Sequence, residues 1–423
     1  MVSNLMVLRY SLVLFLGFYI EKLYNNVFVR GIIKDMEIHM NNKSSRASNI
    51  ELMRILAMLM IISYHIIIHC VNVQLVNLTS IEKLQNGWFN NPLFYKQLMA
   101  IALMMPFGLV GNALFIMISG YFLADRQIDM LKISKKLLSE LLFAAITLVV
   151  ASSVFIWKLT SVETPETLFS YIRIQYFNKM SWFVGYYFII MLLAFCFLNK
   201  FLSSLDKNKY LGFLFTILAI SQLSWSGALL DDLAKGLRTV VIGVFLYSLG
   251  GYIKKYNPFE RLRGYVLFLV IILTNCLIGI SYHNTVMGKI QSYYYNQTVP
   301  GMAATDFVQS IPRFDNYSIV VVVLGVCVFE LFRRLRLPGL KVLNAIARGT
   351  FMIYLLHDNG FAYSIWETQD WITLLYYDFS AFVIKLLSWT LAVFAIGYVA
   401  YLVFLVLIKL ISKTKWLYIK SEA

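Results

Sequence analysis

The feature that most constrains this chain is a series of apolar stretches, each about as long as a bilayer is thick. A membrane-crossing helix needs about 20 mostly apolar residues. Only 14% of the 423 residues are charged, against about 25% in soluble proteins. The sequence therefore predicts an all-α polytopic membrane protein of about ten transmembrane helices. The expected spans are Ile50–Val73, Met99–Leu123, Leu137–Trp157, Ser181–Leu198, Tyr210–Trp225, Leu237–Ile253, Tyr265–Ile280, Tyr317–Phe332, Gly349–Trp366 and Phe379–Ile411.

The positive charges lie mainly in the short segments between these stretches. Lys and Arg number 37 against 22 Asp and Glu, but no soluble module clusters them as a nucleic-acid surface would. Alternate segments and the C-terminal tail, with the helix ends that flank them, hold 22 of the cations, and the segments and helix ends on the other side hold 9. Because cytoplasmic loops carry the excess of Lys and Arg, we expect both termini in the cytoplasm, a lipid bilayer as partner and no nucleic acid.

Three regions follow from this pattern. Residues 1–47 form an N-terminal extension, whose apolar run Ser11–Ile20 is too short to span a bilayer. Two interpretations stay open for it: an interfacial helix, or a stretch upstream of a true start at Met36 or Met40. Residues 48–411 form the membrane domain, and residues 412–423 form a basic cytoplasmic tail. The largest expected outer loop, Ser281–Asn316, is rich in Tyr, Asn and Gln, which suit either sugar contact or an interfacial belt.

The first expected helix carries four ionisable side chains. Charged groups at bilayer depth are expensive and usually functional, and this helix holds Glu51, Arg54, His65 and His69. Arg54 and His65 are eleven residues apart, so they share one helix face about 16 Å apart along the axis. Alternatively, Glu51 and Arg54 form a surface i,i+3 pair and His65 bonds a neighbouring helix. His65 and His69 have metal-ligand spacing, but no third ligand is evident, so no metal is expected.

Other polar or aromatic residues interrupt later apolar segments. Asn112 and Ser119 lie in the second expected helix, beside Gly111 and Gly120, where helix packing is the simpler explanation. Trp182 is the second residue of the fourth, in an aromatic cluster typical of a membrane interface. His357 and Asp358 lie near the middle of the ninth. Adjacent helical residues point about 100° apart, so we expect these two to serve different partners.

Taken together, these residues resemble the integral membrane acyltransferase-3 family, the ten-helix enzymes that O-acylate cell-envelope sugars. The strongest likeness is an Arg followed, after ten residues, by a His in the first helix, preceded by Asn49–Ile50–Glu51. The segments Ser119–Gly120–Tyr121, Trp182–Phe183 and Tyr354 to His357 resemble later family motifs. The likeness covers roughly Ser48 to Leu410.

The resemblance implies acyl transfer across a plasma membrane, in a bacterial cell. The donor would be a cytoplasmic acyl-CoA, by family habit acetyl-CoA, and the acceptor a hydroxyl of a carbohydrate or lipid-linked sugar outside. Arg54 would bind the phosphates of coenzyme A, and the cationic inner loops would attract them. His65 would act as general base or as a covalent acyl carrier.

The resemblance leaves further roles as expectations. Glu51 would orient Arg54, and Asn112 or Ser119 would stabilise the thioester oxyanion. His357, Asp358 and Trp182 would bind the acceptor, although His357 also suits a packing role. The main rival is a secondary transporter or lipid-linked sugar flippase, which also places ionisable residues at the midplane. The two halves show no internal repeat, which favours the enzyme.

Overall fold

The structure, a computed structural model, describes residues 47–77, 92–159, 182–222, 231–296 and 309–421. Helices make up most of these residues, and no strand occurs among them. The N-terminal extension up to residue 46 lies outside the described residues. The all-α expectation is therefore confirmed for the described part of the chain.

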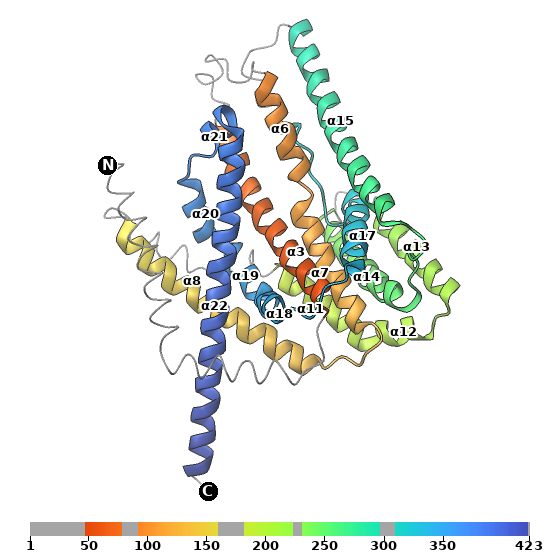
Figure 1. Cartoon of the computed structure of the whole chain (residues 1–423), viewed down its shortest axis with the longest axis vertical. Helices are drawn as coiled ribbons and strands as arrows, with labels where there is room; N and C mark the ends of the chain where they lie inside the picture. Colours follow the sequence, from red (N-terminus) through yellow and green to blue (C-terminus); the bar gives the residue numbers. More distant parts are fainter. Residues whose placement is uncertain (1–46, 78–91, 160–181, 223–230, 297–308, 422–423) are drawn as a thin grey trace.

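The centre of the bundle is α7 (Phe107–Leu123), which packs against α3 (Ser48–Ile66), α14 (Asp231–Tyr256) and α17 (Ile319–Arg334) (Figure 1). Small residues allow these close contacts. A Cβ at Gly111 would lie 2.6 Å from Ile61 of α3, and a Cβ at Gly120 would overlap the backbone carbonyl of Tyr247 in α14. The packing interpretation of these two glycines is thus supported by the contacts.

Other helices, several of them long, surround this centre. In Figure 1, α8 crosses the others obliquely and the carboxyl end of α22 extends beyond the bundle. Large apolar side chains of α15 and α22 are exposed, as expected for surfaces that face lipid. The outer helices are α6 (Pro92–Met104), α8 (Met130–Leu159), α11 (Trp182–Leu193), α13 (Lys207–Gln222), α15 (Gly264–Asn296) and α22 (Phe379–Ser421). Shorter elements are η1 (Ile67–Val71), α4 (Asn72–Asn77), η3 (Ala194–Leu198), α12 (Asn199–Ser204), α18 (Lys341–Arg348), α19 (Thr350–His357), α20 (Gly360–Glu367) and α21 (Ile372–Tyr377).

Six helices of the described part are long and apolar enough to cross a membrane. They begin at Ser48, Lys96, Trp182, Gly236, Gly264 and Phe379. Two of the other expected spans, α13 and α17, have 16 residues each. The total of ten, and the compartment that each end faces, stay predictions.

Three expected helices have a different shape in the structure. The second is interrupted at Pro106, which divides α6 from α7 because proline disrupts a continuous helix. The seventh continues to Asn296, so the first half of the expected outer loop is helical. The ninth is not one helix, because α19 ends at His357 and α20 begins at Gly360. Asn359 caps α20 by accepting a hydrogen bond from the backbone N–H of Ala362.

One end of the bundle collects the segments that the charge count grouped together, and we call it the basic end. Lys254 of α14 pairs with Asp125 after α7 at 2.9 Å. Asn199 of α12 donates to the carbonyls of Leu123 and Arg126. These contacts bring the segments after α7, α11 and α14 to the same end, as the alternation of charge predicts.

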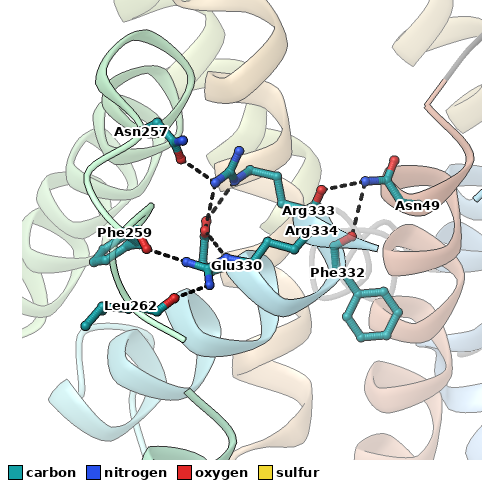
Figure 2. Close-up of polar contacts among 8 residues, drawn as sticks. All are labelled: Asn49, Asn257, Phe259, Leu262, Glu330, Phe332, Arg333 and Arg334. Carbon is teal, nitrogen blue, oxygen red and sulfur yellow. Dashed lines mark hydrogen bonds and ion pairs between the residues drawn. The ribbon is translucent and has the colours of Figure 1, made fainter. Parts of the chain in front are cut away.

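A buried carboxylate anchors the basic end (Figure 2). Glu330 of α17 is fully buried and accepts from Arg333 at 2.7 and 2.8 Å and from Arg334 at 2.6 Å. Arg334 also donates to the carbonyls of Phe259 and Leu262, which ties α17 to the segment before α15. The side chain of Asn49 donates to the last carbonyls of α17 and so fixes the first turn of α3.

Candidate functional site

The structure brings together two histidines that are far apart in the sequence. His65 lies near the end of α3 and His357 is the last residue of α19. The Nδ1 atom of His65 lies 2.8 Å from Nε2 of His357. The two rings are nearly parallel, with centroids 4.9 Å apart. The alternative that His65 bonds a neighbouring helix is therefore confirmed. Its partner is His357 of α19.

The hydrogen bonds of His357 determine which nitrogen of His65 is available. Nδ1 of His357 lies 2.8 Å from the carbonyl oxygen of Tyr354 and 3.2 Å from that of Ile353. Carbonyls only accept hydrogen bonds, so in the neutral ring this nitrogen carries the proton and Nε2 holds a lone pair. That lone pair accepts from Nδ1–H of His65. Nε2 of His65 is then left unprotonated, as a general base requires.

Asp358 places a carboxylate beside the same ring. Its Oδ1 atom lies 3.8 Å from Nδ1 of His65, and it accepts a hydrogen bond from the hydroxyl of Tyr363. A carboxylate at this distance stabilises the positive charge that His65 gains when it takes a proton. The expectation that His357 and Asp358 serve different partners is wrong. The helix ends between them, with Asp358 at φ −97° and ψ 76°, so the helical angle of 100° does not apply.

The chain is also irregular on the other side of the cluster. A π-helical turn, Ile67–Val71, follows His65 directly, and such turns often occur at functional sites. His69 lies in this turn and stacks on Tyr363, with ring centroids 3.9 Å apart. Among the described residues no three His, Cys, Asp or Glu side chains form a group that could hold a metal ion.

A cavity of about 480 Å³ lies close to this cluster, since its lining residue Tyr354 contacts the ring of His357. Among the described residues, three cations line it, Arg54, Lys136 and Arg348, and no carboxylate does. Nη1 of Arg54 donates to both carboxylate oxygens of Glu51 at 3.1 Å, and Glu51 is buried. This is the expected i,i+3 pair, although it is not a surface pair. The apolar and aromatic part of the lining includes Phe115, Leu123, Ile133, Leu137, Phe183, Tyr187, Phe351, Tyr354 and Tyr401.

The remaining expected residues divide between the cavity and its surroundings. Ser119 lines the cavity, and its hydroxyl donates to the carbonyl of Phe115 at 2.9 Å. Asn112 lies on the same stripe of α7 but is buried and does not line the cavity. Trp182 does not line it either and stacks on Tyr186, whereas its neighbour Phe183 is part of the wall.

Tyr354 joins the cavity to the histidine pair. Its ring lines the cavity, 5.1 Å from the ring of Phe183 and 5.5 Å from that of His357. Its backbone carbonyl is the one that orients His357. In the sequence it stands out only as part of a motif, without a role. Lys136 and Arg348 are visible there only as loop charges, because nothing in the sequence shows that α8 and α18 meet α3 at one cavity.

Comparison with known proteins supports the resemblance seen in the sequence. A family model described as an acyltransferase domain matches residues 48–409. No curated protein and no solved structure matches the chain significantly. The match spans nearly the whole described membrane domain, including α3, the cationic cavity and the histidine pair. The chain belongs to the acyltransferase-3 family and is a multi-pass membrane acyltransferase.

Proposed function

We propose that this protein moves an acyl group, by family habit acetyl, from acyl-CoA at the basic end to a hydroxyl of a carbohydrate on the other side of a bacterial plasma membrane. The observation that carries the proposal is the connection made by Tyr354. Its ring lines the cationic cavity, and its carbonyl orients the histidine that bonds His65. A donor held in the cavity would therefore present its acyl end next to a general base.

The donor end of the proposal rests on charge. Coenzyme A carries several phosphate charges, and Arg54, Lys136 and Arg348 line the cavity, whose described lining includes no acidic residue. Both hydrogen bonds of Arg54 to Glu51 come from Nη1, and the rest of the guanidinium group is suited to planar anions. Nε of Arg348 is buried and has no hydrogen-bond partner in the described part of the chain. A phosphate oxygen would satisfy it.

The chemical step follows from the protonation pattern of the pair. Nε2 of His65 takes the proton of the acceptor hydroxyl while the hydroxyl oxygen attacks the thioester carbonyl carbon. The tetrahedral intermediate collapses, the carbon–sulfur bond breaks, and His65 returns the proton to the leaving thiolate. The products are an O-acyl ester and free coenzyme A. Asp358, 3.8 Å from His65, stabilises the imidazolium between the two proton transfers.

The acceptor end is less constrained by the described residues. His357 and Asp358 are expected from the sequence to bind the acceptor, but their contacts with His65 favour a role in orienting that ring. Direct contact of these two residues or of Trp182 with a sugar stays a prediction. The hydroxyl class is proposed because a neutral imidazole base suits an alcohol acceptor.

The test uses purified protein in detergent with radiolabelled acetyl-CoA. We expect wild type to bind the donor and, with water taking the place of the acceptor hydroxyl, to hydrolyse it to acetate and free coenzyme A thiol, measured with a thiol reagent. His65→Ala should bind the donor normally but release thiol about 10²–10⁴-fold more slowly, as expected for loss of a general base. His283→Ala, an exposed histidine of α15, is the matched control and should resemble wild type. Full activity of His65→Ala would refute the catalytic assignment. Well-folded wild type that neither binds nor turns over acetyl-CoA would favour the transporter instead.

A further inference from the structure

Tyr354 is a lining residue of the cavity that carries a buried hydroxyl. The residue is 3% exposed, and its hydroxyl has no hydrogen-bond partner within the described part of the chain. A buried hydroxyl left unsatisfied costs about 1–3 kcal/mol, so such groups are usually paired. Because Tyr354 also lines the cavity, a ligand that enters the cavity is the natural source of its partner.

Neighbouring groups hold the Tyr354 ring in place. Its centroid lies 5.1 Å from that of Phe183 and 5.5 Å from that of His357. Tyr354 and His357 are three residues apart on α19, so their side chains lie on the same face of that helix. The phenol thus contacts both a wall residue of the cavity, Phe183, and His357 of the histidine pair.

We propose that the Tyr354 hydroxyl donates a hydrogen bond to the carbonyl oxygen of the donor thioester, an inference that rests on the proposed function. When the acceptor oxygen attacks the carbonyl carbon, the π electrons of the C=O bond move to that oxygen. The bond from Tyr354 strengthens as the negative charge develops there. When the C=O bond forms again, the carbon–sulfur bond breaks and the thiolate leaves with the proton held by His65. Tyr354 gives up no proton, so the step balances without another reactant.

The two residues expected from the sequence to stabilise this oxyanion fit less well. The Ser119 hydroxyl already donates to the carbonyl of Phe115 at 2.9 Å, so its proton is engaged. Asn112 does not line the cavity. Tyr354 lines the same cavity, and its buried hydroxyl has no hydrogen-bond partner in the described residues.

The substitution Tyr354→Phe tests the proposal, because it removes one oxygen and keeps the ring that packs on Phe183 and His357. We expect thiol release from acetyl-CoA to fall about 10²–10³-fold, the effect of losing one oxyanion donor. Tyr186→Phe is the matched control. Tyr186 is a buried tyrosine of α11 that packs on Phe183 but does not line the cavity, and this variant should keep the wild-type rate.

Two inert donor analogues show whether Tyr354 bonds the thioester carbonyl or only shapes the cavity. The first is a ketone in which a methylene replaces the thioester sulfur, so that it keeps the carbonyl. The second is S-ethyl-CoA, which lacks the carbonyl. Tyr354→Phe should weaken binding of the ketone severalfold and leave binding of S-ethyl-CoA unchanged.

The outcomes distinguish this inference from the function on which it rests. Active wild type with an equally active Tyr354→Phe variant would overturn the role of Tyr354 and leave the acyltransferase intact. Equal weakening of both analogues would overturn the bond to the carbonyl, since the hydroxyl would then only shape the cavity. Wild type that binds neither analogue and releases no thiol would overturn the proposed function, and this inference with it.

Discussion

Replacing His357 with leucine tests whether the histidine pair works as a unit. Leucine fills much of the same buried space but has no nitrogen, so it removes the acceptor 2.8 Å from Nδ1 of His65. It also removes the bond to the carbonyl of Tyr354. His65 then loses the partner that keeps its proton on Nδ1, and the basic nitrogen is no longer determined.

The size of the effect follows from the charge that His65 gains during the reaction. A hydrogen bond to a neutral group contributes about 0.5–1.5 kcal/mol and one to a charged group about 1.5–3 kcal/mol. Only the difference, about 1–1.5 kcal/mol, is specific to the charged state, which corresponds to roughly 5- to 13-fold in kcat. Loss of tautomer control adds to this factor. His357→Gln retains an amide oxygen that can accept from Nδ1, so it should recover part of the lost rate.

The assay is thiol release from acetyl-CoA over a range of donor concentrations and pH. We expect His357→Leu to lower kcat at least 5-fold with little change in KM for the donor, because His357 does not line the cavity. His283→Leu, on α15, should behave as wild type. Size-exclusion chromatography in detergent shows whether each variant is folded. The reasoning is refuted if the leucine variant keeps the wild-type kcat, or if glutamine and leucine give the same loss in folded protein.

Two further predictions concern packing and donor binding. Gly120→Ala should lower the free energy of unfolding in detergent by more than the roughly 1–3 kcal/mol typical of overpacking, because the new Cβ would overlap the backbone of α14. The melting temperature should fall accordingly. Gly212→Ala is the control and should keep the wild-type melting temperature, because nothing lies within 4 Å of the added Cβ. Equal melting temperatures for the two variants would contradict this packing argument. Arg348→Gln should raise KM for acetyl-CoA roughly 10-fold, about the 1.5 kcal/mol of one charge-assisted hydrogen bond, without changing kcat. An unchanged KM would remove Arg348 from the donor site.

The features that depend on composition and spacing could be predicted from the sequence. Apolar stretches of membrane length predict an all-α fold, because a backbone inside a bilayer must satisfy its own hydrogen bonds and a helix does so within one segment. The alternation of Lys and Arg grouped the segments that meet at the basic end, as the contact between Lys254 and Asp125 illustrates. Arg54 and His65 could be placed on one face because a single helix carries both.

The features that depend on how helices meet could not be predicted. Nothing in the sequence states that His357 lies beside His65, 292 residues earlier. The break after His357 lies within one continuous apolar stretch of sequence, and in the structure the cap formed by Asn359 marks the start of a new helix. Asn followed by Gly360 is the local signal that indicates such a boundary. The cavity was missed for the same reason, since its wall comes from α3, α7, α8, α11, α18, α19 and α22.

The two irregular turns at the site have a common physical explanation. In a regular helix His357 and Asp358 would point about 100° apart, and they could not both approach one imidazole. Ending α19 at His357 frees the backbone of Asp358, so the carboxylate reaches His65 from a different direction than the ring does. The π-turn after His65 similarly brings His69 onto Tyr363, the residue that holds the carboxylate of Asp358. The irregular backbone is therefore what allows four side chains from two separate segments to surround one base. A substitution that restored regular helix at either turn would disperse them without removing any of the reacting groups.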